Sequence, residues 1–100
     1  MTDFSFLEPA EIEFEEAVNY FNAQRPGLGD DFSKEVAATI SRILRFPEAW
    51  RKLSRRTRRC RTNRFPYAVV YQIRRDSLLI VAVAHLKRKP YYWRYRLGST

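Results

Sequence analysis

The spacing of the apolar residues changes from helical to strand-like near the middle of the chain. In the first half, apolar residues recur every three or four positions, which places them on one face of a helix. In the second half they alternate with polar residues or form a short continuous run, as they do in strands. This change predicts an α+β domain in which helices pack on one face of a sheet.

The first half predicts a short strand and two helices. The strand covers Phe4–Leu7, and the first helix starts at Glu8–Pro9 and stops before Pro26, because proline disfavours helical backbone at the preceding residue. The second helix is capped by Asp30 or Asp31 and ends at Pro47. The turn over 25–29 is short, so the helices form an antiparallel hairpin. Their predicted buried residues are Phe14, Ala17, Val18 and Phe21 in the first helix and Phe32, Val36, Ile40 and Ile43 in the second.

The second half predicts three strands. A basic strand covers about 54–63, and the next strand places Tyr67, Val69, Tyr71 and Ile73 on one face. A hairpin turn over 74–77 leads to the apolar strand 78–84, which His85 ends. A basic, aromatic tail over 87–96 follows, with a short helical turn after Pro90. The predicted order is β-α-α-β-β-β, with the helical hairpin on one face of a small, mainly antiparallel sheet.

Basic residues are concentrated in the second half of the chain. Residues 1–35 carry nine acidic and two basic residues, whereas residues 36–100 carry two acidic and seventeen basic residues. The segment from Arg51 to Arg64 holds eight Lys or Arg among fourteen residues and no acid. Because this segment leads directly into a predicted buried strand, its cations project from a fixed scaffold. Such a surface predicts an anionic partner: RNA, DNA or an acidic protein segment.

Composition excludes several classes of function. With 100 residues, of which 45% are hydrophobic, the chain is predicted to form one globular domain over residues 1–100. One Cys cannot form an internal disulfide, and one Cys with one His cannot supply a protein-only zinc site. Three glycines leave no phosphate-binding loop. Since the chain also lacks a membrane-spanning run and a signal-peptide pattern, we expect a cytoplasmic protein without cofactor or metal and without a membrane partner.

Candidate functional residues gather on the predicted sheet face opposite the helices. Five side chains from neighbouring strands are expected to converge there: Arg61, Arg64, His85, Arg88 and Tyr92. Arginine donates paired hydrogen bonds to phosphate, and His85 is the one side chain that ordinarily titrates near neutral pH. Tyr91, Tyr92 and Trp93 are expected either to stack on unpaired bases or to fill the edge of the sheet.

Cys60 lies within the basic segment. Flanking arginines would lower its pKa and make the thiol reactive. The alternative is a buried residue that fills space in a strand. A lone Cys is far more often of the second kind, so we expect a structural role.

Three stretches resemble the RelE/ParE superfamily of bacterial toxins. They are the turn Arg25–Gly29, the strand motif Phe-Pro-Tyr-x-Val-x-Tyr that ends at Tyr71, and the segment from Ala82 to Trp93 that contains Ala-Val-Ala-His and Arg88. The resemblance covers essentially the whole chain. It implies the β-α-α-β-β-β fold and a small toxin of a type II toxin–antitoxin system, with a role in plasmid stabilization and growth inhibition. It also implies a co-encoded antitoxin that wraps an often acidic C-terminal segment around the toxin.

The resemblance implies two mechanisms, one for each branch of the superfamily. RelE-like members cleave mRNA on the ribosome, and for that chemistry Arg88 and Tyr92 match the C-terminal arginine and tyrosine, while Arg59 and Arg61 lie on the strand of basic residues. ParE-like members act on DNA gyrase. Here Ala68 stands where RelE-type nucleases have an arginine, so the chain is more similar to the ParE branch.

Three functions therefore stay open, in this order. The first is a ParE-like toxin that arrests growth through DNA gyrase, and the second is a metal-independent, ribosome-dependent endoribonuclease. The third is a nucleic-acid-binding module without toxicity. For the nuclease, the predicted catalytic residues are His85, Arg88 and Tyr92. For binding an anionic partner or nucleic acid, the predicted residues are Arg59, Arg61, Arg64, Lys87 and Arg94.

Overall fold

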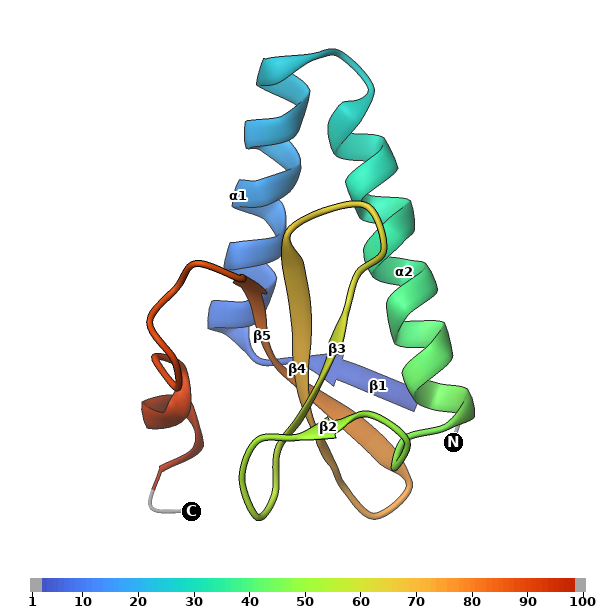
Figure 1. Ribbon diagram of the computed structural model, residues 1–100, viewed down its shortest axis with the longest axis vertical. Helices are drawn as coiled ribbons and strands as arrows, with labels where there is room; N and C mark the ends of the chain where they lie inside the picture. Colours follow the sequence, from blue (N-terminus) through green and yellow to red (C-terminus); the bar gives the residue numbers. More distant parts are fainter. Residues whose placement is uncertain (1–2, 99–100) are drawn as a thin grey trace.

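The computed structural model describes residues 3–98 and contains two helices packed against a five-stranded sheet (Figure 1). In chain order the elements are β1 Asp3–Phe6, α1 Glu8–Gln24, α2 Leu28–Arg45, β2 Arg51–Lys52, β3 Arg58–Arg61, β4 Tyr67–Ile73, β5 Ser77–His85 and a 3₁₀ helix Arg94–Leu97. The strand order is β1-β5-β4-β3-β2. β1 pairs with β5 in parallel, and every other pair is antiparallel. The predicted α+β class and the helical hairpin on one sheet face are confirmed.

The helices follow the predicted pattern, except at the start of α2. That helix begins at Leu28, two residues before Asp30, because Gly27 adopts a φ of 90° and precedes the first turn. Gly29 lies where the two helices meet, and a Cβ atom there would be 2.2 Å from the carbonyl oxygen of Val18. Its backbone N–H donates to Asn22 Oδ1 at 2.8 Å. Glycine therefore lets the hairpin close tightly.

The predicted helix stripes form the core. Every predicted residue of the α2 stripe is buried, and it packs on the helix-facing side of the sheet. In α1, Ala17 is buried, and Phe14, Val18 and Phe21 are partly buried against the same core. Phe21 and Phe32 contact Phe65 with ring centroids 5.0 and 5.2 Å apart, respectively. An aromatic cluster thus joins both helices to the turn before β4.

The predicted basic strand over 54–63 is wrong as a single element. Its residues form a hairpin instead, because Leu53 N–H donates to the carbonyl of Thr57 at 2.8 Å and the hydroxyls of Ser54 and Thr57 bond each other. This turn places Arg55 and Arg56 at an exposed tip between β2 and β3. The sheet therefore gains a two-residue edge strand that the sequence pattern did not predict.

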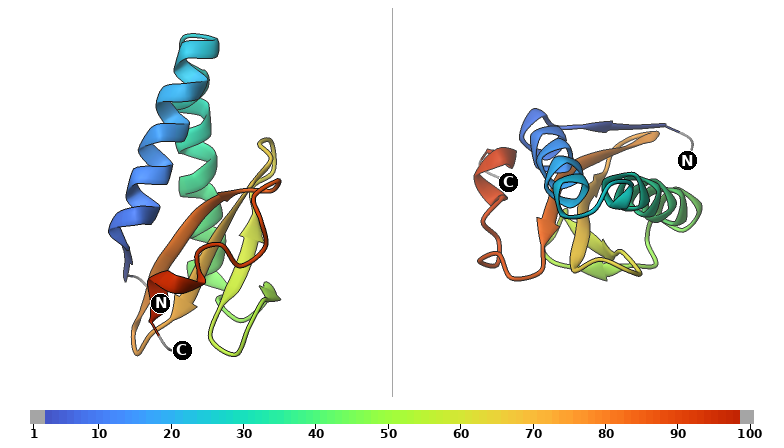
Figure 2. Two further views of the ribbon diagram at one scale, coloured as in Figure 1. Left: turned by 90° about the vertical axis from the view of Figure 1, so that its left-hand side faces the viewer. Right: turned by 90° about the horizontal axis from the view of Figure 1, so that it is seen from above.

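A bulge in β5 alters which residues face the helices. Val70 lies opposite Ala82, whereas Tyr71 lies opposite Ile80, so Val81 is an extra residue in β5. Val81 and Ala82 consequently both lie in the second core cluster, together with Val70 and Trp93. This cluster lies on the sheet face away from the helix-side core and is covered by the C-terminal segment 86–98, drawn in red in Figure 2.

Candidate functional site

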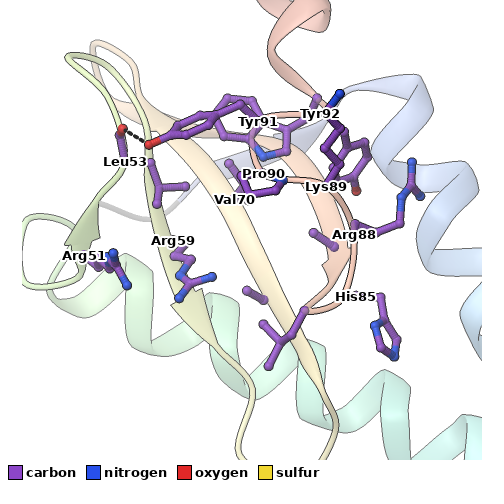
Figure 3. A pocket seen from close by; sticks show the side chains of 14 residues that line it. Arg51, Leu53, Arg59, Val70, His85, Arg88, Lys89, Pro90, Tyr91 and Tyr92 are labelled. Carbon is purple, nitrogen blue, oxygen red and sulfur yellow. Dashed lines mark hydrogen bonds between the residues drawn. The ribbon is translucent and has the colours of Figure 1, made fainter.

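A hollow of about 220 Å³ lies on the sheet face that the helices leave open (Figure 3). We call it the cationic hollow. Its floor comes from β3, β4 and β5, and its wall comes from the C-terminal segment. The lining residues are Arg51, Leu53, Arg59, Ala68, Val70, Ala84, His85, Leu86, Arg88, Lys89, Pro90, Tyr91, Tyr92 and Trp93.

Two arginines on neighbouring strands face the hollow side by side. Arg51 of β2 lies directly opposite Arg59 of β3, and Figure 3 shows both side chains at the same edge of the hollow. Like charges at directly opposed positions destabilise a strand pair. The ion pairs found among residues 3–98 involve other arginines. The pair therefore presents two uncompensated cations to an incoming group.

Glu13 of α1 connects the C-terminal segment to the edge of β5. Its carboxylate accepts hydrogen bonds from both terminal nitrogens of Arg96 at 2.8 and 2.9 Å and from the Tyr92 hydroxyl at 2.6 Å. It also accepts the backbone N–H of Val83 at 3.1 Å. Arg96 in turn donates to the carbonyl of Val81 at 3.0 Å. β1 pairs only with Ser77–Ile80, so Glu13 and Arg96 satisfy backbone groups of β5 beyond the end of β1.

The Glu13 contacts shift the pKa values of the groups involved. Burial raises the pKa of Glu13, but the hydrogen bonds from Arg96, Tyr92 and Val83 outweigh burial and hold it below its usual value. Burial, followed by the hydrogen bond to Glu13, raises the pKa of Tyr92 well above its usual value. The Tyr92 hydroxyl is therefore protonated at neutral pH and already donates its proton to Glu13.

Glu13 was not among the predicted site residues, although its spacing from apolar residues could have indicated a carboxylate on the inner face of α1. It lies three residues after Ala10 and four before Ala17, both of which are buried on the inner face of α1. A carboxylate at this spacing must find cationic partners, because an unpaired buried charge is strongly unfavourable. The sequence did not reveal that these partners come from the far end of the chain.

Arg88 is associated with Tyr92 and Glu13. Its guanidinium lies 3.8 Å from the centre of the Tyr92 ring and 4.0 Å from the Glu13 carboxylate. His85 makes other contacts: its Nδ1 accepts the backbone N–H of Lys87 at 3.0 Å, and its ring meets the edge of Tyr67. Figure 3 shows the His85 ring and the Arg88 guanidinium extending in different directions. The three predicted catalytic residues thus line one hollow, but the contacts of the His85 side chain are separate from the Arg88–Tyr92 pair.

The other predicted cations divide between the hollow and remoter positions. Arg59 lines the hollow, whereas Arg61 lines only a neighbouring depression, which Arg59 also borders. Arg64 lies toward α2, where it is 3.9 Å from the Asp31 carboxylate and stacks on Phe65. Lys87 and Arg94 are exposed and do not line the hollow. The expected convergence therefore holds for His85, Arg88 and Tyr92, but not for Arg61 and Arg64. Arg51 and Lys89 line the hollow as well, although neither was among the residues predicted individually to bind an anionic partner.

The three aromatic residues of the C-terminal segment have different roles. Trp93 is buried against the second core cluster, so it fills the sheet face. Tyr91 adopts a left-handed backbone conformation with a φ of 61° and donates from its hydroxyl to the carbonyl of Leu53 at 3.1 Å. This contact, drawn dashed in Figure 3, closes the hollow between the C-terminal segment and the β2–β3 hairpin. The ring of Tyr91 is exposed.

Cys60 lies on the helix-covered face and is buried. Burial raises its pKa, and the nearby Arg42 guanidinium opposes this effect without reversing it. The expectation that flanking arginines lower this pKa is therefore wrong, because Arg59 and Arg61 belong to the opposite face of β3. The buried position expected of a space-filling Cys60 is confirmed.

Two further observations concern metals and membranes. Within residues 3–98, no three side chains of His, Cys, Asp or Glu gather in a way that would hold a metal ion. No helix of the same range combines the length and apolar character needed to cross a bilayer.

Comparison with known proteins identifies the family. The sequence model of the family described as "ParE toxin of type II toxin-antitoxin system, parDE" matches residues 4–90. No curated protein sequence matches the chain. Among solved structures, a chain of the "Chromosomal ParDE TA system from P. aeruginosa" has a similar fold, with a TM-score of 0.73 and 10% identity over 85% of this chain and 96% of that one. Since the family match covers most of the chain, the protein belongs to the ParE toxin family of type II toxin–antitoxin systems.

Proposed function

We propose that this toxin arrests bacterial growth by binding DNA gyrase and that its cognate antitoxin neutralises it. Membership in a toxin–antitoxin family implies an antitoxin partner. The gyrase target is what the ParE branch of the superfamily implies. The surface that we assign to the target is the cationic hollow with its rim.

The observation that supports this proposal most directly is the hydrogen bond from Tyr92 to Glu13. Cleavage of RNA by transesterification needs one group to accept the 2′-hydroxyl proton and another to protonate the leaving oxygen. The Tyr92 hydroxyl donates to a carboxylate at 2.6 Å, and its pKa is raised. It is a poor base, and as an acid it would have to abandon Glu13. Tyr92 is therefore not arranged for proton transfer, which favours binding over cleavage.

The floor of the hollow supports the same conclusion. Ala68 lies between Arg61 of β3 and Ala84 of β5 and contributes only a methyl group. A nuclease of the RelE type is expected to have a phosphate-binding arginine at this position. A protein-binding surface has no such need, because complementary shape and charge are sufficient.

Three cations of the hollow form no ion pair among residues 3–98, which favours an acidic partner. Arg51, Arg59 and Lys89 line the hollow without an acidic residue among its lining. An acidic segment of the antitoxin would relieve their mutual repulsion, and acidic side chains of the target would do the same. We infer that antitoxin and target compete for this surface.

Growth tests the toxin function first. Induced expression of the chain alone should stop growth, and co-expression of the neighbouring small gene should restore it. Unimpaired growth at a verified protein level would contradict the proposal for this copy.

Two assays with purified protein then identify the target. We expect inhibited supercoiling or trapped cleaved DNA in a gyrase reaction, and intact mRNA when ribosomes are toeprinted in a translation extract. The endoribonuclease is the second candidate, because His85 and Arg88 line the same hollow. Codon-specific mRNA cuts with normal supercoiling would establish it instead. In that case His85→Ala and Arg88→Ala should each lower cleavage by roughly 10²–10⁴-fold.

A further inference from the structure

A second basic depression, separate from the cationic hollow, lies at the end of the sheet where two hairpins turn. Its volume is about 360 Å³. The β2–β3 hairpin contributes Arg55 and Arg56, and the β4–β5 hairpin contributes Arg74. Both turns lie at the same end of the molecule, at the bottom of Figure 1. The depression thus combines cations from segments that are distant in the sequence.

The charge around this depression is nearly unopposed. Five of its lining residues are Lys or Arg, and Glu48 is the single acid among them. Lys52 lies directly opposite Arg58 in the β2–β3 pair, which again places like charges side by side. A merely solvated basic face would spread its charges outward. Here they surround a concave space.

Two of these guanidinium groups are held in place by the protein. Arg58 donates to the carbonyls of Glu48 and Trp50 at 3.1 and 3.0 Å. Arg74 donates from two nitrogens to Gln72 Oε1 at 3.0 and 2.8 Å. Groups fixed in advance lose little conformational freedom when they bind a ligand. The site is therefore partly organised before any partner arrives.

Gln72 adds a donor without a partner. Its side-chain oxygen must face Arg74, because arginine has no acceptor. The amide nitrogen is then left over, and within residues 3–98 it has no hydrogen-bond partner although Gln72 is only 3% exposed. A buried donor beside fixed guanidinium groups matches an anion with several acceptor oxygens, as a phosphate has.

The lining also indicates which phosphate-bearing partner fits. It contains no aromatic ring, so unpaired bases would have nothing to stack on. Ile73 is its one large apolar residue, so an apolar peptide anchor would find little to bury. Contacts to a sugar–phosphate backbone need neither feature. We propose that this depression binds the phosphodiester backbone of duplex DNA without reading its sequence. The choice of duplex DNA rests on the proposed gyrase target, whose substrate is duplex DNA.

Binding of the 100-residue chain to a short labelled duplex, measured by fluorescence anisotropy between about 50 and 200 mM salt, tests this proposal. Each phosphate contact contributes roughly −0.9 to the slope of log K against log salt, so three or four contacts predict a slope of about −3. The double variant R55Q/R56Q should reduce the magnitude of that slope by about 2. The matched control R25Q/K34Q removes the same charge from the exposed helical hairpin and should retain the wild-type slope.

Three results would overturn the proposal. One is the absence of salt-dependent duplex binding, and another is an equal loss in both double variants, which would indicate only the net charge of the chain. The third is tighter binding of single-stranded than of duplex DNA, which would point to the aromatic wall of the cationic hollow. The assay contains no gyrase, so failure here leaves the supercoiling result intact. Conversely, a failed supercoiling assay leaves this binding measurable.

Discussion

The two faces of β4 differ in nearly every physical property, although their residues alternate along one strand. Tyr67, Val69 and Tyr71 pack against the helices within the main core. Ala68 and Val70 face the other way, toward the cationic hollow. The helix-covered face is closed by aromatic and aliphatic side chains. The open face has a small apolar cluster surrounded by arginines, lysines and tyrosines.

The residues that stabilise the fold therefore lie on a different face from those that we expect to bind a partner. The free energy of folding comes mainly from burial on the helix side, because apolar area removed from water is the dominant stabilising term. On the open face, the opposed Arg51 and Arg59 weaken the sheet rather than strengthen it. Residues that are unfavourable for folding and lack partners among residues 3–98 are best explained by a partner outside the chain. Glu13 links the two faces, since its hydrogen bonds with Tyr92 and Arg96 fix the C-terminal segment to α1.

The largest effect is expected from the helix-covered face. Phe32 is fully buried and touches the rings of Phe14, Phe21, Phe65 and Tyr67. Phe32→Ala should lower the free energy of unfolding by about 3–5 kcal/mol, because it leaves a cavity in a closed cluster. Urea denaturation followed by circular dichroism measures the change. A loss below about 1 kcal/mol would mean that the cluster is not the main source of stability.

Glu13→Gln should have the next largest effect. The Arg96 side chain is only 6% exposed and that of Glu13 14%, so the substitution leaves a buried guanidinium without its counter-charge. We expect a loss of about 2–4 kcal/mol, with Glu15→Gln on the exposed face of α1 as a near-neutral control. Relative to the wild type, hydrogen exchange in the variant should accelerate more in segment 86–98 than in β4. Uniform loosening of the whole chain would contradict a local role.

The same substitution predicts a change in acid stability. The pKa of Glu13 is lowered in the folded state, so its contribution is present above the ordinary glutamate pKa of about 4.3 and is lost as the pH falls through the lowered value. The wild type should therefore lose stability more steeply than Glu13→Gln on acidification. Thermal denaturation of both proteins across the acid range measures this. Parallel curves would show that Glu13 does not carry the effect.

Tyr71→Phe should have a smaller effect. The Tyr71 hydroxyl donates to the carbonyl of Pro47 at 2.6 Å, and its loss should cost about 1 kcal/mol. Burial raises the pKa of Tyr71 to about 12. Because the folded value is raised, its stabilising contribution is present below the ordinary value of about 10 and is lost as the pH rises through the folded one. The variant should therefore show a shallower alkaline transition, and an unchanged one would contradict this assignment.

The smallest effect on stability is expected on the open face. R51Q/R59Q should change the free energy of unfolding by less than about 0.5 kcal/mol, because the two arginines oppose each other and have no ion-pair partner among residues 3–98. Arg64→Gln, which loses an exposed contact to Asp31 and the stacking on Phe65, is the control outside the hollow. A destabilisation of more than about 1 kcal/mol in R51Q/R59Q would show that the pair supports the fold.

Local periodicity was sufficient to predict most of the fold. The stripe from Phe32 to Ile43 was predicted correctly because each residue contributes to the same helix face. The break after Lys52 was missed because it depends on hydrogen bonds between Ser54 and Thr57, which charge and period do not reveal. The bulge at Val81 is likewise a property of strand pairing.

The candidate site was less predictable because it, too, depends on contacts that form only in the folded chain. Its cations could be counted, but their direction depends on where each strand ends: Arg59 lies in β3, whereas Arg64 lies in the turn between β3 and β4. Glu13 and Arg96 are 83 residues apart, so only the folded chain brings them together. Sequence reasoning thus found the residue types of the site but not their pairing.

We propose that the open face acts on the target while the helix-covered face maintains the fold. Gyrase supercoiling assays with wild type, R51Q/R59Q and Arg64→Gln, each at matched folded concentration, test it most directly. We predict that R51Q/R59Q needs at least about tenfold more protein for the same inhibition, equivalent to about 1.4 kcal/mol of binding, while Arg64→Gln behaves as wild type. Full inhibition by R51Q/R59Q, or equal losses in both variants, would show that the opposed arginines of the open face do not bind the target.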